Sequence, residues 1–166
     1  MMTNVILVNE NDEPLGLMEK MEAHQKGFLH RAFSVMIFNP HGQVLLQQRA
    51  AAKYHSPRLW TNACCSHQHP QVNDIKWIKE RMKYEMGLEC DIRLKNKFIY
   101  KAHFQNGLTE HELDYLYEGI FNGYPIPNPA EVASWRWVNL PELKQEMKVV
   151  PDNFTFWFKE IISRFY

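Results

Sequence analysis

The sequence predicts a single α+β domain in which helices cover a mixed β-sheet. Strand-like runs lie on both sides of a helical segment, and further helical patterns follow them near the C-terminus. The 166 residues are 45% hydrophobic and 13% aromatic, which is typical of a packed globular protein. This length fits one domain, and no repeat or long linker divides residues 1–166.

The elements of the N-terminal half are predicted from β-type runs and turn residues. The run VILVN at 5–9 predicts a short strand that ends in the turn-rich stretch ENDEPLG. Two apolar runs within 32–49 are joined by NPHG, which favours a hairpin. The segment 73–88 follows the apolar stripe of a helix. Its candidate cap residues are Asn73 or Asp74 at the start and Gly87 at the end.

The C-terminal half continues with strands and then helices. The segments 91–104 and 110–121 alternate as strands do, and the intervening QNGLT is a second hairpin signal. The segment 131–140 predicts a further strand, and 141–147 and 151–165 predict helices.

Charge and cysteine content limit the possible function classes. Lys and Arg together equal Asp and Glu at 19 each, so no overall field attracts nucleic acid or an anionic membrane. Three cysteines are too few for a disulfide framework, which favours a reducing compartment. The N-terminal run VILV is too short for a signal peptide or a membrane span. We therefore expect a cytoplasmic protein with no nucleic-acid or membrane partner. Separately, we expect a monomer.

One stretch, WTNACCSHQHP at 60–70, concentrates two of the three cysteines and two of the eight histidines. It fits a metal site, a thiol catalyst, or a buried strand end whose cysteines are merely small and apolar. Side chains of an extended chain alternate between faces, so Cys65 and His67 share one face while Cys64 lies on the other. The spacing is not that of a zinc finger, because there is no C-x-x-C pair.

Carboxylates and further histidines raise the possibility of a metal site. Glu110, Glu112 and Asp114 share one face of a predicted strand. A solvated strand face is the ordinary explanation, and an anionic metal site or an acid–base pair is the alternative. His24 and His30 are six positions apart, so a loop-to-strand geometry is needed to bring them together. Imidazole combined with carboxylate suits manganese, iron or zinc.

Cations flank the same stretches. Arg49 and Lys53 follow the second strand of the first hairpin, and Arg81 lies one helical turn before Glu85. Arg offers a bidentate fork to phosphate oxygens, and Lys offers a point charge. The ordinary explanation is a solvated surface with a weak Arg–Glu pair on the helix. No glycine-rich phosphate loop is present in the sequence.

Together these motifs resemble the type I isopentenyl-diphosphate isomerases, a branch of the Nudix fold. The resemblance extends from about Met18 to Tyr117, and WTNACCSH is a highly specific signature. It implies a Nudix-type sheet between helices and an enzyme of isoprenoid biosynthesis that interconverts isopentenyl diphosphate and dimethylallyl diphosphate. The stretches that carry it are LMEKMEAH, FLHRAFSVMIFN, LLQQRAAAKYHSPRLWTNACCSHQHP, RMKYEMGL and GLTEHELDYLY.

The resemblance also implies roles for metal ligands. One divalent ion, Mn²⁺, Zn²⁺ or Mg²⁺, would occupy a site of three histidines and two glutamates. A second ion, Mg²⁺, would be held by Glu85 and would bridge to the substrate diphosphate. We expect Glu85 on a helix and the other ligands on loops and a strand. SHQHP has a second histidine where the family has one, so His69 competes with His67. The ligands implied for the first site are His24, His30, His67, Glu110 and Glu112.

The implied catalytic residues match the chemistry. Moving a double bond requires protonation of one carbon and deprotonation of another, through a tertiary carbocation. Cys65 and Glu112 would transfer the protons on opposite faces of the substrate, with Tyr100 assisting Glu112. Trp157 would face the cation, since an indole attracts it by about 1–2 kcal/mol without bonding covalently. The implied diphosphate-binding cations are Lys20, Arg49, Lys53 and Arg81.

Two other function classes compete. Nudix hydrolases carry a helix of the pattern R-E-apolar-x-E-E-x-G-apolar, whereas this chain has ERMKYEMGL. Glu80 and Arg81 are in swapped order and Tyr84 replaces one glutamate, so Glu85 alone remains. One carboxylate supports one diphosphate-bound ion but not a multi-metal attack by water. A non-enzymatic metal-binding module would explain the histidines but not the cations or Cys65.

Overall fold

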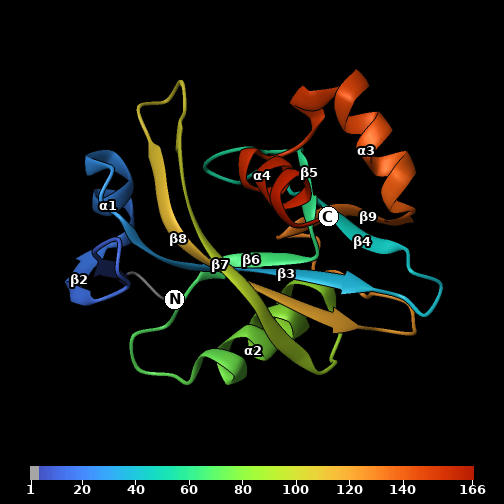
Figure 1. Ribbon diagram of the computed structural model, residues 1–166, viewed down its shortest axis with the longest axis horizontal. Coiled ribbons are helices and arrows are strands. Elements are labelled where there is room, and N and C mark those ends of the chain that lie inside the picture. The colour runs from blue at the N-terminus through green and yellow to red at the C-terminus, as the bar shows by residue number, and fades with distance from the viewer. Residues whose placement is uncertain (1–3) are drawn as a thin grey trace.

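Residues 4–166, which the computed structural model describes, build one sheet of nine strands with helices on both of its faces (Figure 1). The helices are α1 (Lys20–Lys26), α2 (Asp74–Met86), α3 (Leu140–Val149) and α4 (Phe156–Phe165). The strands are β1 (Asn4–Val8), β2 (Pro14–Glu19), β3 (His30–Phe38), β4 (Val44–Arg49), β5 (Trp60–Asn62), β6 (Cys64–His67), β7 (Ile92–His103), β8 (Thr109–Ile120) and β9 (Val132–Val138).

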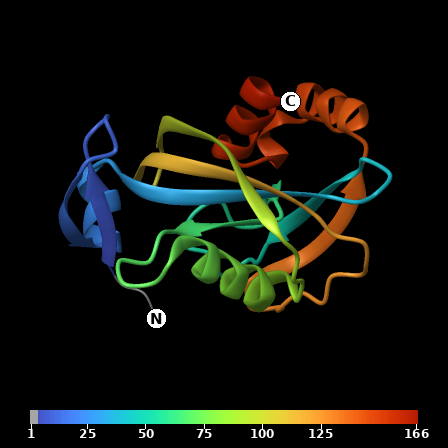
Figure 2. The same cartoon turned by 60° about the horizontal axis from the view of Figure 1, so that its bottom comes forward.

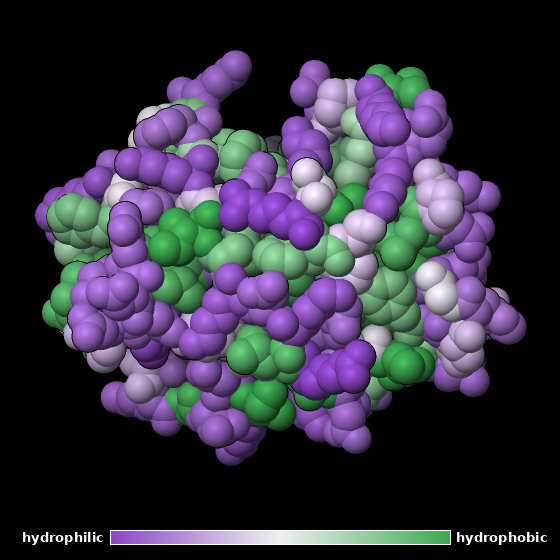
Figure 3. Space-filling view, in the orientation of Figure 1, coloured by the Kyte–Doolittle hydropathy of each residue, from purple (hydrophilic) through white to green (hydrophobic). Residues whose placement is uncertain are grey.

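The layers match the predicted α+β class. Figure 2 shows α2 on one side of the strands and α3 with α4 on the other. β1, β2 and α1 lie together at one end of the molecule. The face seen in Figure 3 mixes hydrophilic and hydrophobic side chains, and hydrophilic ones predominate. No helix among residues 4–166 is long and apolar enough to span a membrane.

β3 occupies the centre of the sheet. It is parallel to β8 from His30 opposite Glu112 to Phe38 opposite Ile120, and it is antiparallel to β6. The predicted hairpin of β3 and β4 pairs at only one position, Phe38 opposite Val44. Beyond that pair the two strands separate, so β4 joins β5 and β9 instead. The predicted β7–β8 hairpin is confirmed, with antiparallel pairing along its length.

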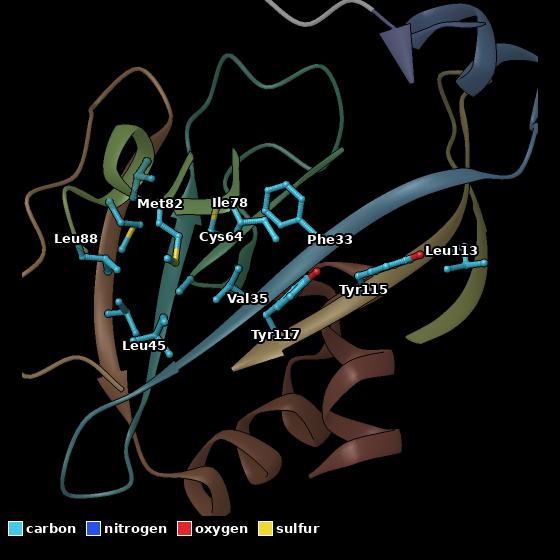
Figure 4. Close-up of a cluster of buried hydrophobic side chains, with 14 of the residues drawn as sticks. Phe33, Val35, Leu45, Cys64, Ile78, Met82, Leu88, Leu113, Tyr115 and Tyr117 are labelled. Atoms are coloured by element: carbon cyan, nitrogen blue, oxygen red, sulfur yellow. The ribbon is translucent and has the colours of Figure 1, made fainter. Parts of the chain in front are cut away.

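Two apolar clusters fix the helices on the sheet. Beneath α2, Ile78 and Met82 pack with Phe33, Val35 and Cys64, all of them buried (Figure 4). On the opposite face, α4 packs with side chains of β3, β4 and β7. The core members from α4 are Trp157, Phe158, Ile161 and Ile162. The sheet is thereby held between two apolar layers.

Several element boundaries differ from the sequence prediction. α2 begins as predicted, and Asn73 rather than Asp74 is the cap, because its side chain accepts from the Lys76 backbone N–H. The predicted helix 151–165 begins only at Phe156, after a 3₁₀ turn at Pro151–Asn153. The stretch ENDEPLG is not all turn, since β2 starts at Pro14. As an edge strand with an exposed face, β2 tolerates Pro and Gly.

Candidate active site

A cavity of about 250 Å³ lies beside β3 and β4, which pair at only one position. Residues of β6, β7 and β8 also line it. Its volume is slightly below the roughly 300–1,000 Å³ range of small-molecule pockets, which favours a small substrate. Every predicted catalytic and diphosphate-binding residue lines it. His24 and His30 are the predicted site residues outside the lining. These predicted lining residues are Lys20, Arg49, Lys53, Cys65, His67, Arg81, Glu85, Tyr100, Glu110, Glu112 and Trp157.

Three histidines meet beside the cavity from three different elements. His24 lies in α1, His30 begins β3 and His67 ends β6. Their ring centroids are 4.9 to 5.2 Å apart. The expectation that loops and a strand carry the ligands is wrong for His24, because this residue lies in the helix α1, which Gly27 caps with φ 67°. That left-handed glycine turns the chain sharply enough for His24 and His30 to converge.

The tautomers of two of these histidines follow from their backbone contacts. Nδ1 of His24 donates to the carbonyl of Lys20 at 2.6 Å, and Nδ1 of His30 donates to that of Phe28 at 2.8 Å. In the neutral ring each Nε2 is therefore left as an acceptor, and both are buried without a hydrogen-bond partner. Orphaned buried acceptors are costly unless a cation binds them. With His67 and Glu112 the donor atoms lie within 4.8 Å of one another, a set that fits a divalent metal.

Glu110 and Glu112 project from β8 into the same region. They are only 3% and 6% exposed, which rejects the solvated strand face. The Tyr100 hydroxyl lies 2.6 Å from an oxygen of each carboxylate, so its single proton can be donated to either one of them. Glu112 Oε1 is 3.0 Å from His67 Nε2. Asp114, two positions further along the same face, accepts a hydrogen bond from Ser34.

Burial sets the protonation states around the cavity. It raises the pKa of the Cys65 thiol to about 12, so this thiol is protonated at neutral pH. Burial also lowers the pKa of His67 to about 4, which keeps the ring in the neutral form that metal binding requires. Burial and the neighbouring Glu110 charge raise the pKa of Glu112, but contacts with His30 and His67 outweigh them and bring it to about 2. Glu112 is therefore an ionised carboxylate.

The two adjacent cysteines lie on opposite sides of β6. Cys64 pairs in register with Val35 and is fully buried in the apolar layer under α2. Cys65 pairs with Ser34 and faces the cavity, where its sulfur lies 4.0 Å from the Arg49 guanidinium. His67 also lines the cavity, as the alternation along the strand predicts.

Cationic side chains gather along another wall of the cavity. Arg81 pairs with Glu85 at 2.5 Å, and Glu85 is buried rather than solvated. The Arg49 guanidinium lies over the Trp157 indole at 5.3 Å. Lys20 lies over the Tyr54 ring at 4.4 Å, and burial lowers its pKa. Partly buried cations that line a cavity form a favourable environment for a phosphate group.

Comparison with known proteins identifies the family of the chain. Residues 28–158 match the NUDIX domain family. The chain is 45% identical over 160 residues to the isopentenyl-diphosphate Delta-isomerase of Burkholderia multivorans, covering 96% of this chain and 91% of that protein. It is 46% identical over 163 residues to the enzyme of the same name from Pectobacterium atrosepticum, covering 98% and 91%. The chain belongs to the Nudix isopentenyl-diphosphate Delta-isomerase family.

Solved structures share the Nudix fold of this isomerase family member. A Deinococcus radiodurans protein superimposes with a TM-score of 0.79 at 18% identity, over 98% of this chain and 99% of that one. A MutT protein from Methanosarcina mazei gives 0.64 at 14% identity, over 82% and 92%. At this identity the likeness concerns the fold alone.

In this Nudix family member, α2 corresponds to the helix that carries the catalytic carboxylates of hydrolases, and it contributes only one carboxylate to the cavity. Of the α2 side chains, Arg81 and Glu85 line the cavity together with Trp77. Glu80 is exposed and Tyr84 is 52% exposed, so neither contributes to the site. His69 packs against Trp77 outside the histidine cluster. His67 is therefore the member of SHQHP that lies among the candidate ligands.

Sequence reasoning missed two residues of this cavity, His55 and Glu131, that form ion pairs with predicted site residues. His55 pairs with Glu110 at 2.6 Å, and Glu131 pairs with Lys53 and lies 3.8 Å from Arg81. His55 belongs to the KYHSP stretch, but a lone histidine has no spacing partner to mark it. Glu131 precedes β9 and reaches the cavity only because the connection from β8 packs against α2.

Proposed function

We propose that this protein interconverts isopentenyl diphosphate and dimethylallyl diphosphate by protonation and deprotonation. The observation that carries the proposal is one small cavity that contains a protonated thiol, Cys65, and an ionised carboxylate, Glu112. A cationic wall lies in the same cavity. An acid, a base and a diphosphate-binding wall are what this isomerisation requires.

The proton transfers use the protein's own groups. Cys65 gives its proton to the terminal methylene carbon of isopentenyl diphosphate, which leaves a positive charge on the tertiary carbon. Glu112 removes a proton from the neighbouring methylene, and the electron pair of the broken C–H bond forms the new double bond. One proton is added to the substrate and one is removed, and the diphosphate is unchanged. Cys65 and Glu112 then regain their starting protonation states by proton exchange with solvent. Tyr100, 2.6 Å from Glu112, holds this carboxylate in position.

The carbocation needs a dry, electron-rich environment. Trp157 is 2% exposed and lines the cavity, so its indole face attracts a cation without becoming a nucleophile for it. A closed pocket keeps water away from the reacting carbon and so prevents capture of the cation as an alcohol.

Two divalent ions complete the proposal. His24, His30, His67, Glu110 and Glu112 would hold one ion, Mn²⁺, Zn²⁺ or Mg²⁺, whose charge would tune the proton affinity of Glu112. The donor atoms of His24, His30, His67 and Glu112 lie within 4.8 Å of one another, and Glu110 lies equally close to His24. Glu85 would hold Mg²⁺ together with the substrate, and the negative diphosphate would balance the charge of the ion. The cationic residues orient the diphosphate oxygens, and that binding energy aligns the reacting carbons. These residues are Lys20, Arg49, Lys53 and Arg81.

A product analysis tests the function. The purified protein is incubated with isopentenyl diphosphate, and dimethylallyl diphosphate and released phosphate are both measured. We expect double-bond migration without phosphate, loss of activity with a chelator, and recovery with added divalent metal. Phosphate release without migration would instead identify a Nudix hydrolase, and metal binding with neither product would identify a binding module.

Compartment and assembly complete the proposal. We propose a reducing cytoplasm as the compartment, because three cysteines are too few for a disulfide framework. We expect a monomer that binds neither membranes nor nucleic acid. Light scattering of the purified protein measures the mass, and a dimer mass would refute the monomer.

A further inference from the structure

His55 is buried in the loop between β4 and β5 and lines the cavity. Two residues that follow it in the same loop, Ser56 and Arg58, have positive φ values of 48° and 62°. Residues other than glycine adopt this left-handed region at a cost, so the surrounding structure must hold the loop in place. The loop is therefore built to deliver His55 to a defined position.

The contacts of His55 reach two parts of the site. Its Nε2 lies 2.6 Å from Glu110 Oε1, and both side chains are 4% exposed. This contact is shorter than the 3.5 Å between His24 Nε2 and the same oxygen. The ring stacks on Phe104 with centroids 5.2 Å apart, and it meets the Trp157 indole edge-on at 5.6 Å. Aromatic contacts on two sides leave the imidazole little freedom to rotate.

We propose that His55 is a positioning residue that orients Glu110 for its divalent cation. Its Nε2–H donates to Oε1, while the Tyr100 hydroxyl lies 2.6 Å from Oε2. Glu110 is thus held at both oxygens. Each carboxylate oxygen has a second lone pair, so a cation can still bind. Partners of this kind fix a metal-binding carboxylate and strengthen its binding to the ion.

The geometry favours positioning over direct ligation. The ring centroids of His24, His30 and His67 lie 4.9 to 5.2 Å apart, whereas those of His24 and His55 are 6.3 Å apart. The donor atoms of His55 form one set with those of His24 and Glu110, and those of His24, His30, His67 and Glu112 form another. His55 therefore lies beside Glu110 and outside the set that contains the three convergent histidines.

Two variants separate the hydrogen bond from the aromatic packing. His55→Phe keeps a ring between Phe104 and Trp157 but cannot donate. His55→Gln loses the ring but can present an amide N–H near the position of Nε2. His41→Phe, at an exposed position in the β3–β4 turn, is the matched control. Zn²⁺ affinity of the metal-stripped proteins is measured against a chromogenic chelator, together with the melting temperature.

We expect His55→Phe to bind Zn²⁺ about 10- to 100-fold more weakly than the wild type. His55→Gln should stay close to the wild type, and His41→Phe should be unchanged. Full affinity in His55→Phe would overturn the proposal, and so would an equal loss in both His55 variants. If His55→Phe does not fold, His55→Leu replaces it.

A spectroscopic measurement tests direct ligation separately. Co²⁺ bound to His55→Gln should give the visible absorption spectrum of the wild type, because the ligands are the same. A changed spectrum would make His55 a ligand and refute the positioning role. The inference rests on the metal site of the proposed function but not on isomerase activity. Because no substrate is present in either experiment, a failure of the isomerase proposal would not imitate a failure of this one.

Discussion

Replacing Cys64 and Cys65 with serine, one at a time, tests the different environments on the two faces of β6. Cys64 is fully buried beneath α2, so a serine hydroxyl there would be removed from water without gaining a dedicated hydrogen-bond partner. This should lower the free energy of unfolding by about 1–3 kcal/mol. For a domain of this size each kcal/mol lowers the melting temperature by about 2–4 °C, so Cys64→Ser should melt roughly 2–12 °C lower and stay active.

Cys65→Ser should behave in the opposite way. Its side chain faces the cavity, so fold, metal content and melting temperature should stay near those of the wild type. Because a hydroxyl is a much weaker acid than a thiol, isomerisation should fall about 100- to 10,000-fold. The assay combines the isomerisation rate, elemental analysis and calorimetry, with Cys90→Ser as the control outside the cavity. An inactive Cys64→Ser beside an active Cys65→Ser would refute the face assignment.

Three further predictions concern the same cavity. Glu85→Gln should weaken Mg²⁺-dependent binding of inorganic pyrophosphate and leave the other metal in place; equal loss of both metals by elemental analysis would contradict separate sites. Trp157→Phe should retain more activity than Trp157→Ala, because a smaller π face still attracts a cation. Equal kcat values for the two variants would show that Trp157 serves only in packing. Since burial raises the Cys65 pKa to about 12, the chelator-treated Cys90→Ser protein should react with iodoacetamide about tenfold faster per pH unit from pH 7 to 10. A plateau by pH 9 would show an ordinary thiol.

Periodicity in the sequence predicted the regular elements and the sides of their residues. The helix at 73–88 and the hairpin of 91–121 were predictable because each is long and repeats its apolar pattern. Alternation along a strand predicted that the side chains of Cys64 and Cys65 lie on opposite faces, and that those of Glu110 and Glu112 share a face. These are local properties of a strand and need no knowledge of its neighbours.

Burial and convergence were not predictable in the same way. α1 has seven residues, too few for a helical period to stand out, and so His24 was expected on a loop. The exposure of Glu110 depends on which elements cover β8, and spacing along one strand says nothing of that. His55 reaches Glu110 across a loop of irregular backbone. Such contacts arise from tertiary packing rather than from a repeating pattern.

Proton exchange with solvent tests the central claim most directly. The protein is incubated with isopentenyl diphosphate in D₂O, and the products are followed by proton NMR. The proposed acid and base predict dimethylallyl diphosphate that carries solvent deuterium in a methyl group, with no free phosphate. They also predict that Cys65→Ala and Glu112→Gln each abolish this product. Migration of the double bond without deuterium, or release of phosphate from unlabelled substrate, would contradict the account.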